Sequence, residues 1–144
     1  MTSVAVIGAG AGGAAAVVEL TLAGHEVRWW NRNPATIAPF RDAGGVRYQG
    51  VLGEGTARPA LLADTLAAAL SGADVAMVCL PSLAHEPVAR ALADAGIRCP
   101  LVLNPGHTGG ALHVAALLRD SGVSVPPLAE LSTLRGRLLE SQQG

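Results

Sequence analysis

The sequence predicts a three-layer α/β/α domain built on a doubly wound, mainly parallel sheet. Short apolar runs alternate along the chain with Ala- and Leu-rich segments of helical periodicity. The apolar runs are also continuous, as expected for strands buried on both faces of a parallel sheet that helices cover. The 144 residues fit a single domain, and we expect the strand order 3-2-1-4-5-6.

The strands are predicted from the apolar runs, and turn residues separate them. We expect strands at residues 4–7, 26–30, 61–63, 75–79, 100–103 and, broken by Pro126-Pro127, within 123–130. Residues 46–56 alternate and contain three glycines, so they predict a β-hairpin with Gly53-Glu54-Gly55 at its turn.

The helices are predicted from their periodicity and from residues that favour helix ends. We expect helices at residues 14–23, 34–43, 64–70, from near 87 to near 96, and 111–121. Gly24 suits the position after the first helix, where a left-handed conformation is needed. Asn33 with Pro34 predicts the start of the second helix, and Asp64 the cap of the third. Pro87 would lose a backbone bond deep in a helix, so the fourth helix is expected to begin near it.

Composition and charge exclude several classes of protein. Charged residues make up 15 % and the net charge is −1 without any basic run, so no nucleic-acid partner is expected. The longest apolar stretches are about seven residues, against roughly 20 needed to span a bilayer, so we expect no membrane span. The N-terminus lacks the features of a signal peptide, and a cytoplasmic protein is expected. Cys79 and Cys99 make neither a disulfide framework nor a metal site. We expect residues 1–131 to form the domain and 132–144 a polar tail.

A glycine-rich turn directly follows the first predicted strand. Gly8, Gly10 and Gly13 match the pattern G-x-G-x-x-G, and a helix follows at once. In Rossmann folds the first glycine makes the tight turn, the second lets the backbone approach a pyrophosphate, and the third lets the helix pack on the strand. The amides of Ala11 and Gly12 at the helix start would face the anion. The alternative is a turn that only reflects the Gly- and Ala-rich composition; the strand–turn–helix context favours dinucleotide binding.

The end of the second strand bears on the choice between NAD and NADP. An Asp or Glu there would bind the ribose 2′-hydroxyl of NAD, but this sequence has Asn31, Arg32 and Asn33 instead. Arg32 could pair with a 2′-phosphate, to which the two asparagines could donate, and this favours NADP. An arginine stacked on the adenine or merely solvated is the alternative, and it is compatible with NAD.

The loop after the fourth strand lies where doubly wound sheets bind ligands, at the carboxyl ends of the strands. Leu80 and Pro81 are expected beside the cofactor, and Ser82 and His85 are candidate catalytic residues near the nicotinamide. For His85 the alternative is a surface residue near the start of a helix.

The loop after the fifth strand has a proline and three glycines within residues 104–110, which indicates an unusual backbone. Asn104 and His107 are candidate catalytic residues, and Pro105 and Gly106 are candidate cofactor contacts. The amides of residues 108–110 could form a second anion site at the start of the next helix.

These motifs, in this order, resemble the N-terminal domain of the opine dehydrogenases (the octopine/nopaline dehydrogenase family). The matching pieces are Gly8-x-Gly10-x-x-Gly13, residues 23–27, residues 72–75, Pro81 with Ala84-His85-Glu86, the loop 104–112, and Ala129-Glu130 with Thr133-Leu134. The first two pieces are shared by many Rossmann dehydrogenases, including relatives of glycerol-3-phosphate dehydrogenase and ketopantoate reductase. The Asn-Pro-Gly-x-Thr-Gly-Gly loop with the upstream Ala-His-Glu is more specific. His107 departs from the family, which commonly has Arg at that position.

The resemblance implies an oxidoreductase that transfers hydride from NAD(P)H to the imine of an amino acid and a 2-oxo acid. It implies cofactor binding by the three glycines and Arg32, with both loops bordering the nicotinamide. The family's catalytic histidine lies in a C-terminal helical domain, and this chain ends before one begins. We therefore expect a separate substrate-domain chain or a second copy as partner, with a homodimer interface near residues 131–139. The alternatives are a stand-alone, non-catalytic dinucleotide-binding or sensor protein and a purely structural module, against which the intact glycine pattern argues.

Overall fold

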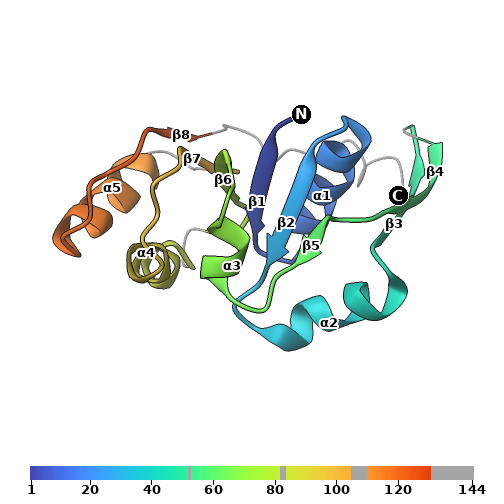
Figure 1. Ribbon diagram of the computed structural model, residues 1–144, viewed down its shortest axis with the longest axis horizontal. Helices are drawn as coiled ribbons and strands as arrows, with labels where there is room; N and C mark the ends of the chain where they lie inside the picture. Colours follow the sequence, from blue (N-terminus) through green and yellow to red (C-terminus); the bar gives the residue numbers. More distant parts are fainter. Residues whose placement is uncertain (52, 82–83, 105–109, 131–144) are drawn as a thin grey trace.

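The computed structural model describes residues 1–51, 53–81, 84–104 and 110–130, which form a sheet with helices on both faces (Figure 1). Its strands are β1 (Ser3–Ile7), β2 (Glu26–Trp30), β3 (Val46–Gly50), β4 (Gly53–Ala57), β5 (Leu61–Leu62), β6 (Val75–Val78), β7 (Leu101–Leu103) and β8 (Leu128–Glu130). Its helices are α1 (Ala11–Leu22), α2 (Pro34–Ala43), α3 (Leu66–Leu70), α4 (His85–Asp94) and α5 (Gly110–Asp120).

The main sheet is parallel and has the order β5-β2-β1-β6-β7-β8. Numbered along the sheet's own strands, this is 3-2-1-4-5-6, so the predicted topology is confirmed. The order reverses between β1 and β6, and the ends of these strands therefore diverge into a crevice of the kind where doubly wound sheets bind ligands.

Two hydrophobic cores lie on the two faces of the sheet. One packs α1 and α2 against β1 and β2, with Val6, Trp29 and Ile37 among its buried side chains. The other packs α3, α4 and α5 against the opposite face, where Leu92 and Leu103 are buried. These layers are the predicted α/β/α arrangement.

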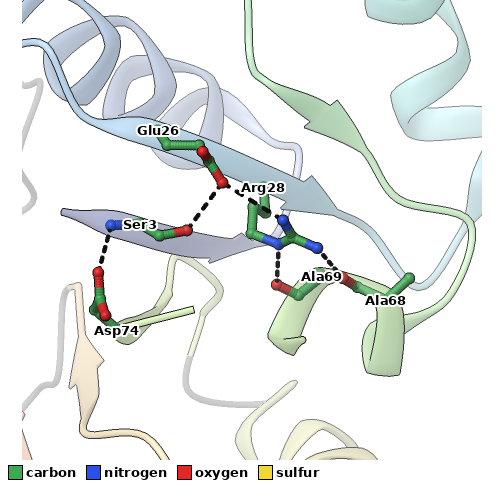
Figure 2. Close-up of polar contacts among 6 residues, drawn as sticks. All are labelled: Ser3, Glu26, Arg28, Ala68, Ala69 and Asp74. Atoms are coloured by element: carbon green, nitrogen blue, oxygen red, sulfur yellow. Dashed lines mark hydrogen bonds and ion pairs between the residues drawn. The ribbon is translucent and has the colours of Figure 1, made fainter. Parts of the chain in front are cut away.

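Arg28 of β2 joins the sheet to the last turn of α3 (Figure 2). Its Nε donates to the carbonyl oxygen of Ala69 at 3.0 Å and its Nη2 to that of Ala68 at 2.8 Å. Carbonyl groups at a helix end have no partner within the helix, so a cation there supplies both a donor and a favourable charge. Glu26 accepts from Arg28 at 3.5 Å and from Ser3 Oγ at 3.2 Å, which links β2 to β1.

The hairpin was predicted correctly, but its turn was not. Gly50 pairs with Gly53, so the chain reverses between these two residues, and Gly53-Glu54-Gly55 belongs to β4. Tyr48 pairs with Gly55 across the hairpin, and a Cβ on Gly55 would lie 2.8 Å from the Tyr48 hydroxyl oxygen. Gly55 thus makes room for the Tyr48 ring instead of making the turn.

Several helix ends differ from the prediction. Helix α1 begins at Ala11, directly after the turn, and not at residue 14. The cap of α3 is Thr65, whose Oγ1 accepts from the amide of Ala68 at 3.1 Å, while the Asp64 carboxylate accepts from Arg41 at 3.2 Å. Helix α4 begins at His85, so Pro87 lies in its first turn, where it removes no helical bond.

Candidate functional site

The glycine turn between β1 and α1 is fixed by two close approaches of the backbone. Gly8 has a φ of +116°, and a Cβ there would lie 2.6 Å from the carbonyl oxygen of Cys79 and 3.0 Å from the Leu80 side chain. A Cβ on Gly13 would overlap the carbonyl oxygen of Gly8. These positions therefore need glycine for the packing of the chain itself, as the sequence pattern predicts for the tight turn and for the helix–strand contact.

Gly10 differs from both, because none of the described residues requires glycine there. A Cβ on Gly10 would meet no atom of the described residues within 4 Å, and its φ of −75° is one that any residue adopts. Gly10 is also the N-cap of α1, with no side-chain cap, and the first turn of α1 has no Asp or Glu. The first amides of a helix have no partner within it, so the turn combines open space with unused donors.

Three hydrogen bonds hold the turn against the end of β2. The amide of Gly8 donates to the carbonyl oxygen of Trp30 at 2.9 Å, and Trp29 Nε1 donates to that of Gly8 at 2.7 Å. The amide of Ala9 donates to Asn31 Oδ1 at 3.0 Å, and Asn31 Nδ2 donates to the carbonyl oxygen of Asn33 at 2.9 Å. Sequence reasoning missed Trp29, although a buried indole N–H needs an acceptor and the nearby turn supplies one.

Arg32 follows the end of β2 as an exposed cation. Among the described residues, its side chain has no hydrogen-bond or ion-pair partner. Asn33, the next residue, caps α2 by accepting from the amide of Ala35 at 3.0 Å, as predicted. The guanidinium therefore lies at the edge of the sheet where the ribose is expected, near the start of α2.

The loop after β6 begins beside the glycine turn. The Leu80 side chain lies against the glycine turn, 3.0 Å from where a Cβ on Gly8 would be. His85 is 1 % exposed at the first position of α4, so the alternative of a surface histidine is wrong. Ser82 lies outside the described residues.

Asn104 follows β7 and is fully buried. Its Nδ2 donates to Met77 Sδ at 3.6 Å and to Cys79 Sγ at 3.8 Å. Burial raises the pKa of the Cys79 thiol to about 12, against the smaller opposite effect of the bond from Asn104. Cys79 is thus a free thiol buried in the core. Pro105, Gly106 and His107 lie outside the described residues.

The start of α5 already has a carboxylate from the chain itself. Glu130 Oε2, at the end of β8, accepts from the amide of Ala111 at 3.1 Å. A Cβ on Gly110 would lie 3.3 Å from this oxygen, 3.5 Å from Leu103 Cδ1 and 3.6 Å from His85 Cε1, so the start of α5 meets the ends of β7 and β8 and the start of α4. The second anion site was predicted on residues 108–110, and only Gly110 is within the described part. The neighbouring amide of Ala111 is capped by the Glu130 carboxylate, which local sequence could not reveal.

The described residues were also compared with the requirements of a metal site and of a membrane-spanning helix. Their His, Cys, Asp and Glu side chains form no group of three that could hold a metal ion. In the part of the chain that the structure describes, none of the helices has the length and apolar character needed to cross a bilayer.

Comparison with known proteins supports the predicted resemblance. The chain is 34 % identical over 131 residues to an opine dehydrogenase of Arthrobacter sp. (strain 1C). This alignment covers 90 % of this chain and 36 % of the relative. A solved octopine dehydrogenase in complex with NADH and agmatine has a TM-score of 0.65 and 25 % identity, over 84 % of this chain and 32 % of that one. An imine reductase of Streptomyces aurantiacus has a TM-score of 0.59 and 25 % identity, over 85 % and 38 % of the two chains.

The chain thus spans about a third of the length of these relatives. Over that third, its fold and sequence match theirs. The sequence pattern of the ketopantoate reductase PanE/ApbA family matches residues 4–102, more than half of the chain. The chain therefore belongs to the ketopantoate reductase PanE/ApbA family.

Proposed function

We propose that this chain is the NAD(P)(H)-binding domain of an opine dehydrogenase-like oxidoreductase, with NADP(H) as its preferred cofactor. The observation that carries the proposal is the contrast within the glycine turn. Gly8 and Gly13 are required by the packing of the chain, whereas Gly10 borders open space at a helix start without its own capping group. A pyrophosphate is the group that such a helix start accommodates.

The residues present fit a nicotinamide dinucleotide. The amides of Ala11, Gly12 and Gly13 would bind the pyrophosphate, and Arg32 would pair with the ribose 2′-phosphate. Asn31 would act indirectly, because its side-chain oxygen already holds Ala9 in the turn. Leu80 and Pro81, together with Pro105 and Gly106, would border the nicotinamide.

The bound cofactor would supply hydride to the imine formed from an amino acid and a 2-oxo acid. Because His85 and Asn104 are buried, we assign them to holding the ends of β6 and β7 in place. Ser82 and His107 stay candidates for direct contact with the substrate. The family's proton-transferring histidine would come from a second domain, as the greater length of the relatives suggests.

Calorimetric titration of NADPH and NADH into the purified chain tests the proposal. We expect NADPH to bind more tightly, and Arg32→Ala to weaken NADPH about tenfold, the effect of losing one charge-assisted contact of ~1.4 kcal/mol. Arg32→Ala should leave NADH unchanged. Arg98→Ala is the matched control, because Arg98 is also exposed but precedes β7, at the opposite edge of the sheet.

Two outcomes would overturn parts of the proposal. An equal loss for NADPH and NADH in Arg32→Ala would place Arg32 against the adenine and remove the preference for NADP. Binding of neither cofactor by a folded sample would make the glycine turn structural and end the dehydrogenase proposal for this chain.

A further inference from the structure

The glycine turn lies between two apolar side chains, those of Trp30 at the end of β2 and of Leu80 after β6. Ile7, the last residue of β1, pairs with Trp30 on one side and with Val78 on the other. The amide of Gly8 then donates to the carbonyl oxygen of Trp30, and a Cβ on Gly8 would lie 3.0 Å from the Leu80 side chain. One apolar side chain therefore borders the turn from the β2 side and one from the β6 side.

Trp30 and Leu80 also share a face of the sheet. Both pack against the core beneath α3, α4 and α5, whereas Trp29 is buried on the α1 face. Ile7 and Val78, which lie between them, are at most 1 % exposed, but Trp30 and Leu80 are only half-buried. Two partly exposed apolar side chains thus lie at the carboxyl ends of the strands, where doubly wound sheets bind ligands.

We propose that the exposed part of the Trp30 ring stacks on the adenine of the dinucleotide, an inference that rests on the proposed function. A dinucleotide has one ring system on each side of its pyrophosphate, and Trp30 and Leu80 lie on the two sides of the turn. Arg32, proposed to hold the 2′-phosphate, comes two residues after Trp30, a span of at most ~7 Å. Adenine is attached to that same ribose, so it falls beside Trp30 and the nicotinamide beside Leu80.

The surroundings of Trp30 suit it for stacking. Proteins hold a base by its face on an aromatic side chain, and this contact needs no polar partner. The amide of Gly8 fixes the backbone of Trp30, and the core fixes its side chain, so little conformational freedom is lost when a ligand binds. Among the described residues, its indole N–H makes no hydrogen bond that would hold the ring elsewhere. With Trp30 against the adenine, Arg32 is available for the phosphate.

Fluorescence can test the stacking, because the chain has two tryptophans and Trp29 is 0 % exposed. The probe is adenosine 2′,5′-bisphosphate, which has the adenine and the 2′-phosphate but no nicotinamide. A purine stacked on an indole quenches its emission, so we expect saturating probe to quench the wild-type chain and Trp29→Phe, which keeps Trp30. Trp30→Phe should lose this quenching, although calorimetry should show that it still binds the probe through its phenyl ring.

The affinity for the probe provides the second measurement. Trp30→Leu removes the aromatic face and should weaken binding about tenfold, as expected for the loss of one stacked base. The matched control is Tyr48→Leu, since Tyr48 is also a half-buried aromatic residue but lies in the β3–β4 hairpin, and its affinity should equal that of the wild type. Reduced nicotinamide mononucleotide has no adenine, so Trp30→Leu should bind it as the wild type does.

Three results would overturn the inference while the proposed function stands. They are quenching that persists in Trp30→Phe, unchanged affinity of Trp30→Leu for the probe, and an equal loss for the probe and for reduced nicotinamide mononucleotide, which would indicate a distorted turn. If Trp30→Leu does not fold, the quenching in Trp30→Phe decides alone. A folded wild-type chain that binds neither NADPH nor the probe would overturn the proposed function, and this inference with it.

Discussion

The indole Nε1 of Trp29 donates a hydrogen bond to the carbonyl oxygen of Gly8 at 2.7 Å. The largest of the fully buried side chains among the described residues thus holds the tightest point of the glycine turn. The ring of Trp29 also packs against Phe40 of α2, with ring centroids 4.8 Å apart. The geometry of the proposed cofactor site therefore depends on a core residue that has no access to the cofactor.

Trp29→Phe is expected to destabilise the domain and to weaken NADPH binding together. The substitution keeps an aromatic ring in the core but leaves the Gly8 carbonyl without its indole donor, at a cost of about 1–3 kcal/mol. Urea unfolding and calorimetry measure the two effects. Trp30→Phe is the control, since the half-buried Trp30 makes no side-chain hydrogen bond with the described residues; an equal effect of both variants would contradict the prediction.

Gly10→Ala and Gly13→Ala should separate cofactor binding from packing. Gly10→Ala meets no atom of the described residues, so the free energy of unfolding should change by less than about 0.5 kcal/mol, while NADPH binding weakens about tenfold or more. Gly13→Ala overlaps the Gly8 carbonyl and should cost about 1–3 kcal/mol in stability. Undiminished NADPH binding by Gly10→Ala would rule out close approach of the pyrophosphate to this residue.

Arg28→Ala should destabilise the fold more than the loss of an ordinary surface ion pair. The guanidinium has two carbonyl acceptors at the end of α3, and removing it should cost about 1–2 kcal/mol in the free energy of unfolding. Arg90, whose exposed pair with Glu86 spans 3.0 Å within α4, provides the comparison. Arg90→Ala should change the stability by less than about 0.5 kcal/mol. If chemical denaturation showed the same loss of unfolding free energy in Arg28→Ala and Arg90→Ala, the contact of Arg28 with α3 would contribute no more than a surface ion pair.

Glu130→Ala should destabilise the start of α5 by about 0.5–2 kcal/mol, as the loss of a helix cap does. Glu130→Gln keeps an acceptor oxygen for the Ala111 amide, so its loss of stability should be smaller than that of Glu130→Ala. Hydrogen exchange of the first amides of α5 would localise the effect. Glu54→Ala, at an exposed position of the hairpin, should leave that exchange unchanged; unaltered protection in Glu130→Ala would contradict the role of Glu130 as a cap.

The two cysteines should differ in reactivity with a thiol reagent at pH 8. The thiolate is the reactive form, and burial raises the pKa of Cys79 to about 12. Burial also raises the pKa of Cys99, which is only half-buried. Cys99 should therefore be modified first and Cys79 only upon unfolding, as mass spectrometry of Cys79→Ala and Cys99→Ala variants would establish. Because folding raises the pKa of Cys79, the unfolded chain loses this thiol proton at a lower pH than the folded chain does. The free energy of unfolding should therefore fall as the pH rises from about 9 toward 12.

Features that depend on local sequence were predicted well. Continuous apolar runs located the main-sheet strands, and the cap at Asn33 with Pro34 fixed the start of α2 to the residue. The glycine turn was assigned from its spacing, and the close approaches of Gly8 and Gly13 give two of the three glycines the expected packing role.

Features that depend on contacts between distant residues were predicted poorly. Asp64 and Thr65 are both good capping residues; in the structure Thr65 caps the helix, while Asp64 pairs with Arg41, 23 positions away in the sequence. The capping of α5 by Glu130 joins residues 19 positions apart, and nothing near Ala111 in the sequence announces it. The hairpin turn was misplaced because Gly55 looks like a turn residue, whereas it is needed for contact with Tyr48.

The central place of β1 in the sheet has a consequence for synthesis of the chain. One edge of β1 can pair with β2 soon after translation begins, but its other edge pairs with β6, which ends at Val78. At about 5–20 residues per second, the interval between the two strands is roughly 4–14 s. During that time an apolar strand edge has no partner and can join another nascent chain. The first strand made thus keeps one edge unpaired until the second half of the sheet has emerged.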